Sequence, residues 1–120
     1  MLKDTSIKFR FDLIQEGKKN LKKNEDLIAE IITKSMGKPL QQSKNELKTM
    51  FHRLDSICSM AEEQLEDEII KSDENTLLKI KKEPYGNLLL ISPWNYPLIC
   101  LINNLVTGIL YLFNYRYIMW

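Results

Sequence analysis

The sequence places one side-chain amide, Asn95, at the end of its most apolar stretch, "NLLLISPWNYPL". An amide held at the mouth of a buried strand can donate a hydrogen bond to an oxygen that becomes negative in a transition state. Pro93 and Pro97 restrict the backbone on either side, and Trp94 and Tyr96 supply rigid apolar packing. Ligands of open parallel sheets also bind beyond the carboxyl ends of the strands. Asn95 is therefore a candidate oxyanion donor.

A helix start is the competing interpretation of Asn95. Asn followed two positions later by Pro, ahead of an apolar segment, is an ordinary way to begin a helix, which here would start near Pro97. The local residues alone favour this capping role. A more specific pattern is needed to choose the oxyanion role instead.

Two amphipathic helices are predicted at the start of the chain. Apolar residues at helical spacing predict the first over residues 5–22, and Asn24 can cap the second. Gly37, which can adopt the left-handed conformation, and Pro39 predict the end of the second helix. The positions that define the first apolar face are Ile7, Phe11, Ile14 and Leu21.

A third helix is predicted from the S-x-x-E pattern of Ser43 and Glu46, which is typical of a capping box. Its apolar stripe extends the helical region, 5–68 in total, to the acidic residues near its end, which we interpret as a solvated face rather than a metal site. The stripe comprises Leu47, Met50, Phe51, Leu54, Ile57, Cys58, Ala61 and Leu65.

Strands are predicted after the helices, over residues 76–92. The alternation in "TLLKIKKEP" is typical of a half-exposed strand, and Pro84 with Gly86 predicts a turn. The continuous apolar run "NLLLIS" that follows indicates a strand buried on both faces, as in parallel sheets. A final helix is expected over residues 97–112.

Charge is balanced overall but unevenly distributed. The net charge of +1 provides no field that would attract nucleic acid. All 16 acidic residues lie at or before Glu83, and Arg116 is the one charged residue in the 37 positions beyond it. A surface normally carries mixed charges. We therefore expect residues 88–120 to be covered, either by further protein or by lipid.

Cysteine usage gives no indication of a metal centre. Cys58, Cys100 and His52 lack the short spacings of zinc sites, and two distant cysteines do not make a disulfide framework. We expect two buried free thiols. The polar segment 1–10 does not resemble a secretory signal, so the expected location is the cytoplasm.

Two linked motifs resemble the NAD(P)-dependent aldehyde dehydrogenase superfamily. "EPYGNLLLISPWNYPL", Glu83 to Leu98, is similar to its Glu-Pro-x-Gly, apolar strand, Pro-Trp-Asn-(Phe/Tyr)-Pro-Leu signature. Upstream, "NEDLIAEIITKSMGKPLQQSKNEL" is similar to the family's helix ending in Glu-x-Gly-Lys-Pro and the helix that follows it. Ser35 departs from the family's Glu. The resemblance extends from about Ile7 to Leu110.

The resemblance implies roles for a few residues. Asn95 would stabilise the tetrahedral hemithioacetal of an aldehyde substrate as the oxyanion donor. The family's nucleophilic Cys, general-base Glu and glycine-bearing cofactor turn lie downstream of this region, and Cys58 and Cys100 do not match the nucleophile motif. The backbone that would line the NAD or NADP site comprises Ile91, Ser92, Pro93 and Trp94.

The implied fold is α/β, with amino-terminal helices and the first strand of a Rossmann-like cofactor domain, incomplete in this chain. Residues 1–110 are expected to form this part of one domain, and the sheet strand is expected to lack partners. By the same resemblance, the strand over 77–83 would belong to a small extension used in subunit contacts, and full-length relatives are expected to be homo-oligomeric. Residues 111–120 form a tail that departs from the family pattern.

Two classes of protein follow from these observations. The first is an amino-terminal piece of an aldehyde dehydrogenase, from a frameshift, a premature stop or an incomplete gene, and inactive alone. The second is a tail-anchored membrane protein with a helical cytosolic head, since residues 97–113 carry no charge and are framed by aromatic residues. Asn103, Asn104 and Pro97 argue against such a span.

Overall fold

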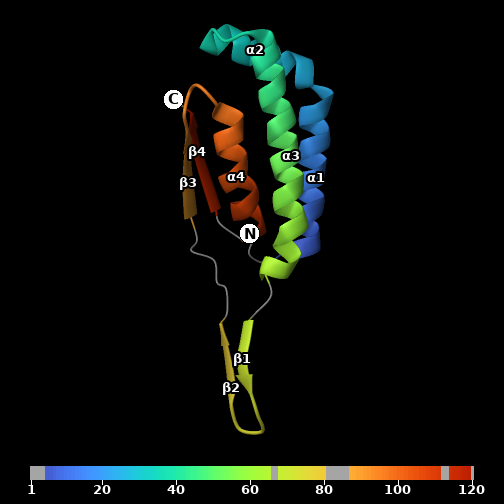
Figure 1. The fold of residues 1–120 in the computed structure, drawn as a ribbon, viewed down its shortest axis with the longest axis vertical. Coiled ribbons are helices and arrows are strands. Elements are labelled where there is room, and N and C mark those ends of the chain that lie inside the picture. The colour runs from blue at the N-terminus through green and yellow to red at the C-terminus, as the bar shows by residue number, and fades with distance from the viewer. Residues whose placement is uncertain (1–4, 66–67, 81–86, 112–113, 120) are drawn as a thin grey trace.

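The computed structural model describes residues 5–65, 68–80, 87–111 and 114–119. The molecule is elongated, with extents of 63 × 24 × 23 Å. A two-stranded sheet, a central helix and further helices form successive layers, and a hairpin projects from one end (Figure 1). The elements are α1 (Ile7–Lys23), α2 (Glu25–Met36), α3 (Leu40–Leu65), β1 (Glu68–Ser72), β2 (Leu77–Ile80), β3 (Asn87–Ser92), α4 (Pro97–Leu110) and β4 (Asn114–Met119).

The core lies mainly between α3 and α4. The predicted apolar stripe of the third helix is buried along most of its length, and α4 presents Ile102, Val106 and Leu110 to it. Ile14 and Ala29 add contacts from α1 and α2. The stripe residues in this core are Leu47, Met50, Phe51, Leu54, Cys58 and Ala61, with Ile57 partly buried against it.

The buried face of α1 differs in part from the apolar face that the sequence predicts. Ile14 is buried, but Ile7 is exposed and the other buried position is Arg10. The Arg10 guanidinium donates to the backbone carbonyls of Ser6, at 3.3 Å, and of Leu110. Burial lowers the pKa of Arg10 by desolvation. A buried cation that donates to the last carbonyl of α4 is favoured there by the helix dipole, and periodicity alone does not detect it.

The junctions around α2 confirm one prediction and change another. Gly37 has φ 72°, and its N–H donates to the Thr33 carbonyl at 2.9 Å, so the predicted left-handed stop is confirmed. Asn24 occupies the cap position of α2 without a side-chain capping bond. Its side-chain amide donates instead to the Asn20 carbonyl at 2.9 Å.

The capping box predicted at Ser43 and Glu46 is wrong. α3 already begins at Leu40, and the N–H groups of Gln42 and Ser43 donate to the Pro39 carbonyl. Ser43 therefore lies inside the helix, where its hydroxyl is 2.8 Å from that of Thr33 on α2. Glu46 is also inside the helix and buried, and its partners lie elsewhere.

The hairpin of β1 and β2 was only partly anticipated. The predicted helical region includes Glu68, and no strand is predicted over residues 69–72. The structure instead has β1 there. The strands pair antiparallel, with Glu68 opposite Ile80 and Ser72 opposite Leu77. Every described position of both strands is exposed, so the expected half-exposed alternation is wrong. Residues 81–86, with the predicted turn, lie outside the described part of the chain.

The strand β3 has a neighbour and one covered face. It pairs in parallel with β4, from Asn87 opposite Asn114 to Ser92 opposite Met119, so the strand expected to lack partners has one within the tail. Leu90 is buried toward the interior, whereas Leu89 is exposed. The expectation of burial on both faces is therefore wrong, because α4 covers one face of the sheet (Figure 1).

The helix expected over 97–112 extends over Pro97–Leu110. Its 14 residues correspond to about 21 Å at a rise of about 1.5 Å per residue. Within the described ranges, we find no helix with the length and apolar character needed to cross a membrane.

Candidate active site

The predicted site residues lie together where β3 ends and α4 begins. Asn95 and Pro93 are exposed, and Trp94 has 62% of its surface accessible. Ser92 is buried, and its hydroxyl donates to the Pro97 carbonyl, which ties the two ends of this turn together. Asn95 is therefore exposed to solvent in a turn whose two ends are joined by a hydrogen bond.

The competing role of Asn95 as a helix cap does not match the geometry. The cap position of α4 is Tyr96, without a side-chain capping bond, and Pro97 is the first helical residue. The next N–H groups, of Leu98 and Ile99, donate to Oε1 of Glu46 at 2.9 and 3.4 Å. Among the described residues, we find no hydrogen-bond partner for the Asn95 side-chain amide. Its donors remain available.

Lys38 joins Glu46 at this turn, and sequence reasoning missed both residues. Lys38 Nζ pairs with Oε2 of Glu46 and donates to the Asn95 backbone carbonyl at 3.1 Å. The same ammonium lies 4.7 Å from the centroid of the Tyr96 ring. The Gly-Lys-Pro motif that ends α2 could have drawn attention to Lys38, but its contact lies 57 positions away in sequence.

A hollow of about 270 Å³ opens beside the Asn95 side chain. The end of α2 and the turn before α4 form its walls, so segments far apart in the sequence enclose it. It is smaller than most pockets for drug-sized ligands, which span about 300–1,000 Å³. The lining residues are Met36, Gly37, Lys38, Gln42, Trp94, Asn95 and Tyr96.

The backbone expected to line a dinucleotide site suits such a role in part. It lies at the carboxyl end of a parallel strand, the edge at which open α/β sheets bind ligands. Ile91, Pro93 and Trp94 are exposed there. Ser92, between them, is buried, and its hydroxyl is committed to the Pro97 carbonyl.

The two cysteines differ in environment. Both are free thiols; Cys58 is buried in the core, but Cys100 is exposed, so the expectation of two buried thiols is wrong for Cys100. Burial raises the pKa of the Cys58 thiol, and the nearby Asp55 carboxylate raises it further. A protonated core thiol is a poor nucleophile. In the described ranges, no group of His, Cys, Asp and Glu could hold a metal ion.

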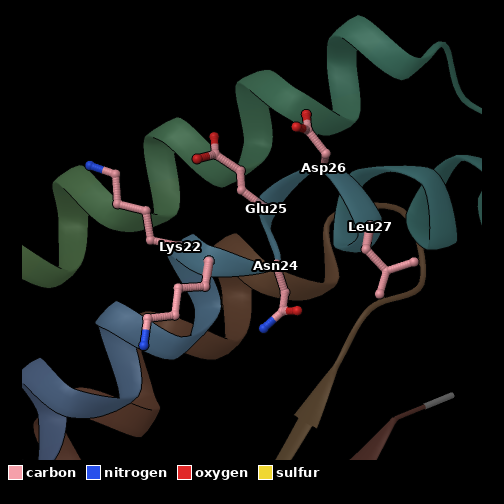
Figure 2. Close-up of a pocket in the computed structure, with 6 residues that line it drawn as sticks. Lys22, Asn24, Glu25, Asp26 and Leu27 are labelled. Atoms are coloured by element: carbon pink, nitrogen blue, oxygen red, sulfur yellow. The ribbon is translucent and has the colours of Figure 1, made fainter.

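A second hollow, of about 360 Å³, lies at the junction of α1 and α2 (Figure 2). One continuous segment, residues 22–27, forms all of it. Glu25 and Asp26 point to one side of the junction, whereas Asn24 and Leu27 point to the other (Figure 2). Asp26 is also paired with Lys44 at 2.8 Å. The side chains do not converge, so this hollow has no arrangement of groups for binding or chemistry.

Comparison with known sequences identifies relatives for nearly the whole chain. The sequence profile of the aldehyde dehydrogenase family matches residues 1–111. Lactaldehyde dehydrogenase of Methanococcus maripaludis (strain DSM 14266) is 35% identical over 98 residues, which is 82% of this chain and 21% of the relative. The succinate semialdehyde dehydrogenase [NAD(P)+] Sad of Escherichia coli K12 is 30% identical over 96 residues, or 80% of this chain and 21% of the relative.

Solved structures show the same fold. Glyceraldehyde-3-phosphate dehydrogenase GapN from Methanocaldococcus jannaschii, complexed with NADP, superimposes with a TM-score of 0.86 at 24% identity over 97% of this chain and 25% of that one. Succinic semialdehyde dehydrogenase from Streptococcus pyogenes, with NADP+, gives 0.85 at 20% identity over 95% and 25%. The helices and small sheet thus match the amino-terminal portion of this α/β fold, as predicted.

The chain spans about a fifth of the length of these curated relatives. Within that fifth, the matched region covers the helices, β3, the Asn95 turn and α4. The chain belongs to the aldehyde dehydrogenase family.

Proposed function

We propose that this chain carries the oxyanion-stabilising part of an NAD(P)-dependent enzyme that oxidises an aldehyde to a carboxylic acid. Asn95 is the residue on which the proposal depends. The observation that carries it is an exposed side-chain amide, unused for helix capping, at the carboxyl end of a parallel strand in a chain of this family.

The chemistry assigned to Asn95 is electrostatic. When a thiolate adds to an aldehyde carbonyl, the carbonyl oxygen gains a negative charge. A fixed N–H donor aimed at that oxygen stabilises the transition state more than the ground state, and one such donor contributes about 10²–10³ in kcat. The side-chain amide of Asn95 would supply this donor from a turn whose backbone is closed by Ser92 and Lys38.

The other parts of the reaction require residues beyond those identified here. NAD or NADP, when bound, would supply the hydride acceptor for the oxidation. The segment from Ile91 to Trp94, exposed except at Ser92, would line that cofactor site. Neither Cys58 nor Cys100 matches the family's nucleophile motif, so we propose that residues 1–120 alone do not turn over aldehydes.

The β1–β2 hairpin would serve subunit contacts in the complete protein. Five large apolar side chains on it are exposed, and an isolated two-stranded hairpin is at best marginally stable in water. Contact with another subunit would cover this surface, which supports the role that the family resemblance implies. The exposed residues are Ile69, Ile70, Leu77, Leu78 and Ile80.

A chimeric enzyme tests the proposed function. Residues 1–110 of this chain would replace the matching segment of the M. maripaludis lactaldehyde dehydrogenase, and reduction of NAD or NADP with lactaldehyde would be followed by absorbance. We expect turnover by the chimera and none by residues 1–120 alone. A folded chimera with both the nucleophile and the base of its host but no turnover would contradict the proposal, as would turnover by the short chain.

A further inference from the structure

A buried carboxylate links three parts of the chain at the candidate site. The side chain of Glu46, on α3, has no accessible surface. Its Oε1 accepts from the N–H groups of Leu98 and Ile99 in the first turn of α4, and its Oε2 pairs with Lys38 beyond the end of α2. Leu98 and Ile99 lie 52 and 53 positions from Glu46 in the sequence, whereas Lys38 lies 8 positions from it.

The surroundings of Glu46 account for a charge at a buried position. An unpaired buried charge is strongly unfavourable, whereas charge-assisted hydrogen bonds and a partner ion compensate for lost hydration. The start of a helix also carries unsatisfied N–H groups and a partial positive charge. Glu46 meets both requirements, because it supplies the cap that α4 lacks in its own sequence.

Lys38 extends this pair to the backbone of Asn95 itself. Its ammonium has three donors. One is directed to Glu46, another to the Asn95 carbonyl at 3.1 Å, and the ammonium also lies 4.7 Å from the centre of the Tyr96 ring. The left-handed Gly37 immediately before it turns the chain back toward α3.

We propose that Glu46 and Lys38 are positioning residues that fix the Asn95 amide in its working orientation. The inference rests on the proposed role of Asn95 as the oxyanion donor. Residues 93–96 belong to no helix or strand, and Trp94 and Tyr96 are exposed, so their own packing does not define this conformation. Among the described residues, Ser92 closes the turn at its base and the Cys100 N–H donates to the Tyr96 carbonyl, while the Glu46–Lys38 pair provides the contacts to other elements that hold it.

The Glu46–Lys38 pair contributes to the chemistry by placing the Asn95 amide precisely. A misplacement of about 1 Å by a residue away from the reacting atoms can cost about a hundredfold in rate. Glu46 holds the backbone after Asn95 through Leu98 and Ile99, and Lys38 holds the carbonyl of Asn95. The backbone at and after Asn95 is thereby held without using the donors of its side-chain amide.

Nuclear magnetic resonance of residues 1–120 tests the positioning directly. We expect Lys38→Met to move the side-chain amide resonances of Asn95, and Glu46→Ala to speed amide exchange at Leu98 and Ile99 by about tenfold or more. Lys44→Met is the matched control, because it also removes a lysine–carboxylate ion pair of α3, the 2.8 Å contact with Asp26 on α2. It should leave both signals unchanged.

Kinetics of the active chimera separate positioning from simple stabilisation. We expect Lys38→Met to lower kcat about tenfold with KM within about twofold, and Lys38→Arg, which keeps the charge, to restore most of the loss. Equal spectra and equal kcat for the Lys38→Met and Lys44→Met variants would overturn the inference. If Asn95→Ala leaves kcat unchanged while the resonances still move, the proposed function fails but the positioning stands.

Discussion

Asn95 keeps its amide in solvent because Glu46 already occupies the N–H groups that Asn95 could have capped. The sequence motif identifies Asn95, since an amide between two prolines at a strand end is conspicuous locally. Glu46 could not be assigned its partners in this way, because they lie 52 and 53 positions further along the chain. Local spacing instead predicted a capping role within its own helix.

The two cysteines differ in a way that alkylation can measure. At neutral pH we expect iodoacetamide to modify the exposed Cys100 at least about tenfold faster than Cys58, which is buried. Burial, followed by the charge of Asp55, raises the pKa of Cys58, so less of it is thiolate at a given pH. Its modification should keep increasing above pH of about 8.5, the ordinary thiol value.

Mass spectrometry of each tryptic peptide over a pH series gives both rates. A Cys100→Ala variant allows the modification of Cys58 to be followed alone. When the chain is unfolded in urea, Cys58 should react as fast as an exposed thiol. Equal rates for the two folded-state thiols at neutral pH would contradict the placement of Cys58 in the core.

The helices of this chain were more predictable than its strands. Periodic apolar residues and the Gly37 stop are local signals, and α1, α2 and α3 follow them to within a few residues. Strand β3 was found from its apolar run, but its partner β4 and its one-sided burial depend on tertiary contacts. β1 was missed because its residues follow an acidic helix end without alternation.

Substitution by alanine should have opposite effects at Gly37, which caps the end of α2, and at Gly17, which lies within α1. Gly37→Ala should lower the free energy of unfolding by about 1–2 kcal/mol, because its φ of 72° is unfavourable for a residue with a Cβ. Gly17→Ala, within α1, should raise that energy by about 0.5–1 kcal/mol, since alanine favours the helix. No atom lies within 4 Å of either added Cβ, so backbone conformation alone decides the sign.

Urea denaturation followed by far-ultraviolet circular dichroism measures both changes. Gly37→Asn serves as a control, because Asn tolerates the left-handed conformation better than Ala and should lose less stability. A Gly37→Ala variant as stable as the parent chain would show that α2 does not end in the described conformation.

The stability of the whole molecule depends on one core, formed mainly by α3 and α4. The β3–β4 sheet lies beside this core, and α4 covers one of its faces. α3 and α4 contribute most of the buried residues, while Leu89, Ile91 and the hairpin leave apolar groups exposed. The lack of charge beyond Glu83 predicts a region covered by other groups, and this stays a prediction. A chain that spans about a fifth of its relatives' length is consistent with such open surfaces.

Alanine substitutions of a core leucine and of a surface leucine should differ clearly in their effect on the free energy of unfolding. Leu47 is fully buried on α3, so Leu47→Ala should lower the free energy of unfolding by about 2–5 kcal/mol through lost burial and a cavity. Leu27 on α2 is 57% exposed, and Leu27→Ala should change it by no more than about 0.5 kcal/mol. Denaturant titration of both variants tests this. Similar losses at the two sites would contradict a core centred on α3.

The most direct test of the central claim is kcat of the lactaldehyde dehydrogenase chimera with Asn95→Ala. Asn104, an exposed asparagine on α4, provides the matched control. We expect Asn95→Ala to lower kcat by about 10²–10³ with little change in KM and less than about 0.5 kcal/mol in stability, and Asn104→Ala to leave kcat unchanged. An Asn95→Ala chimera whose kcat stays within about threefold of the parent would contradict the oxyanion role.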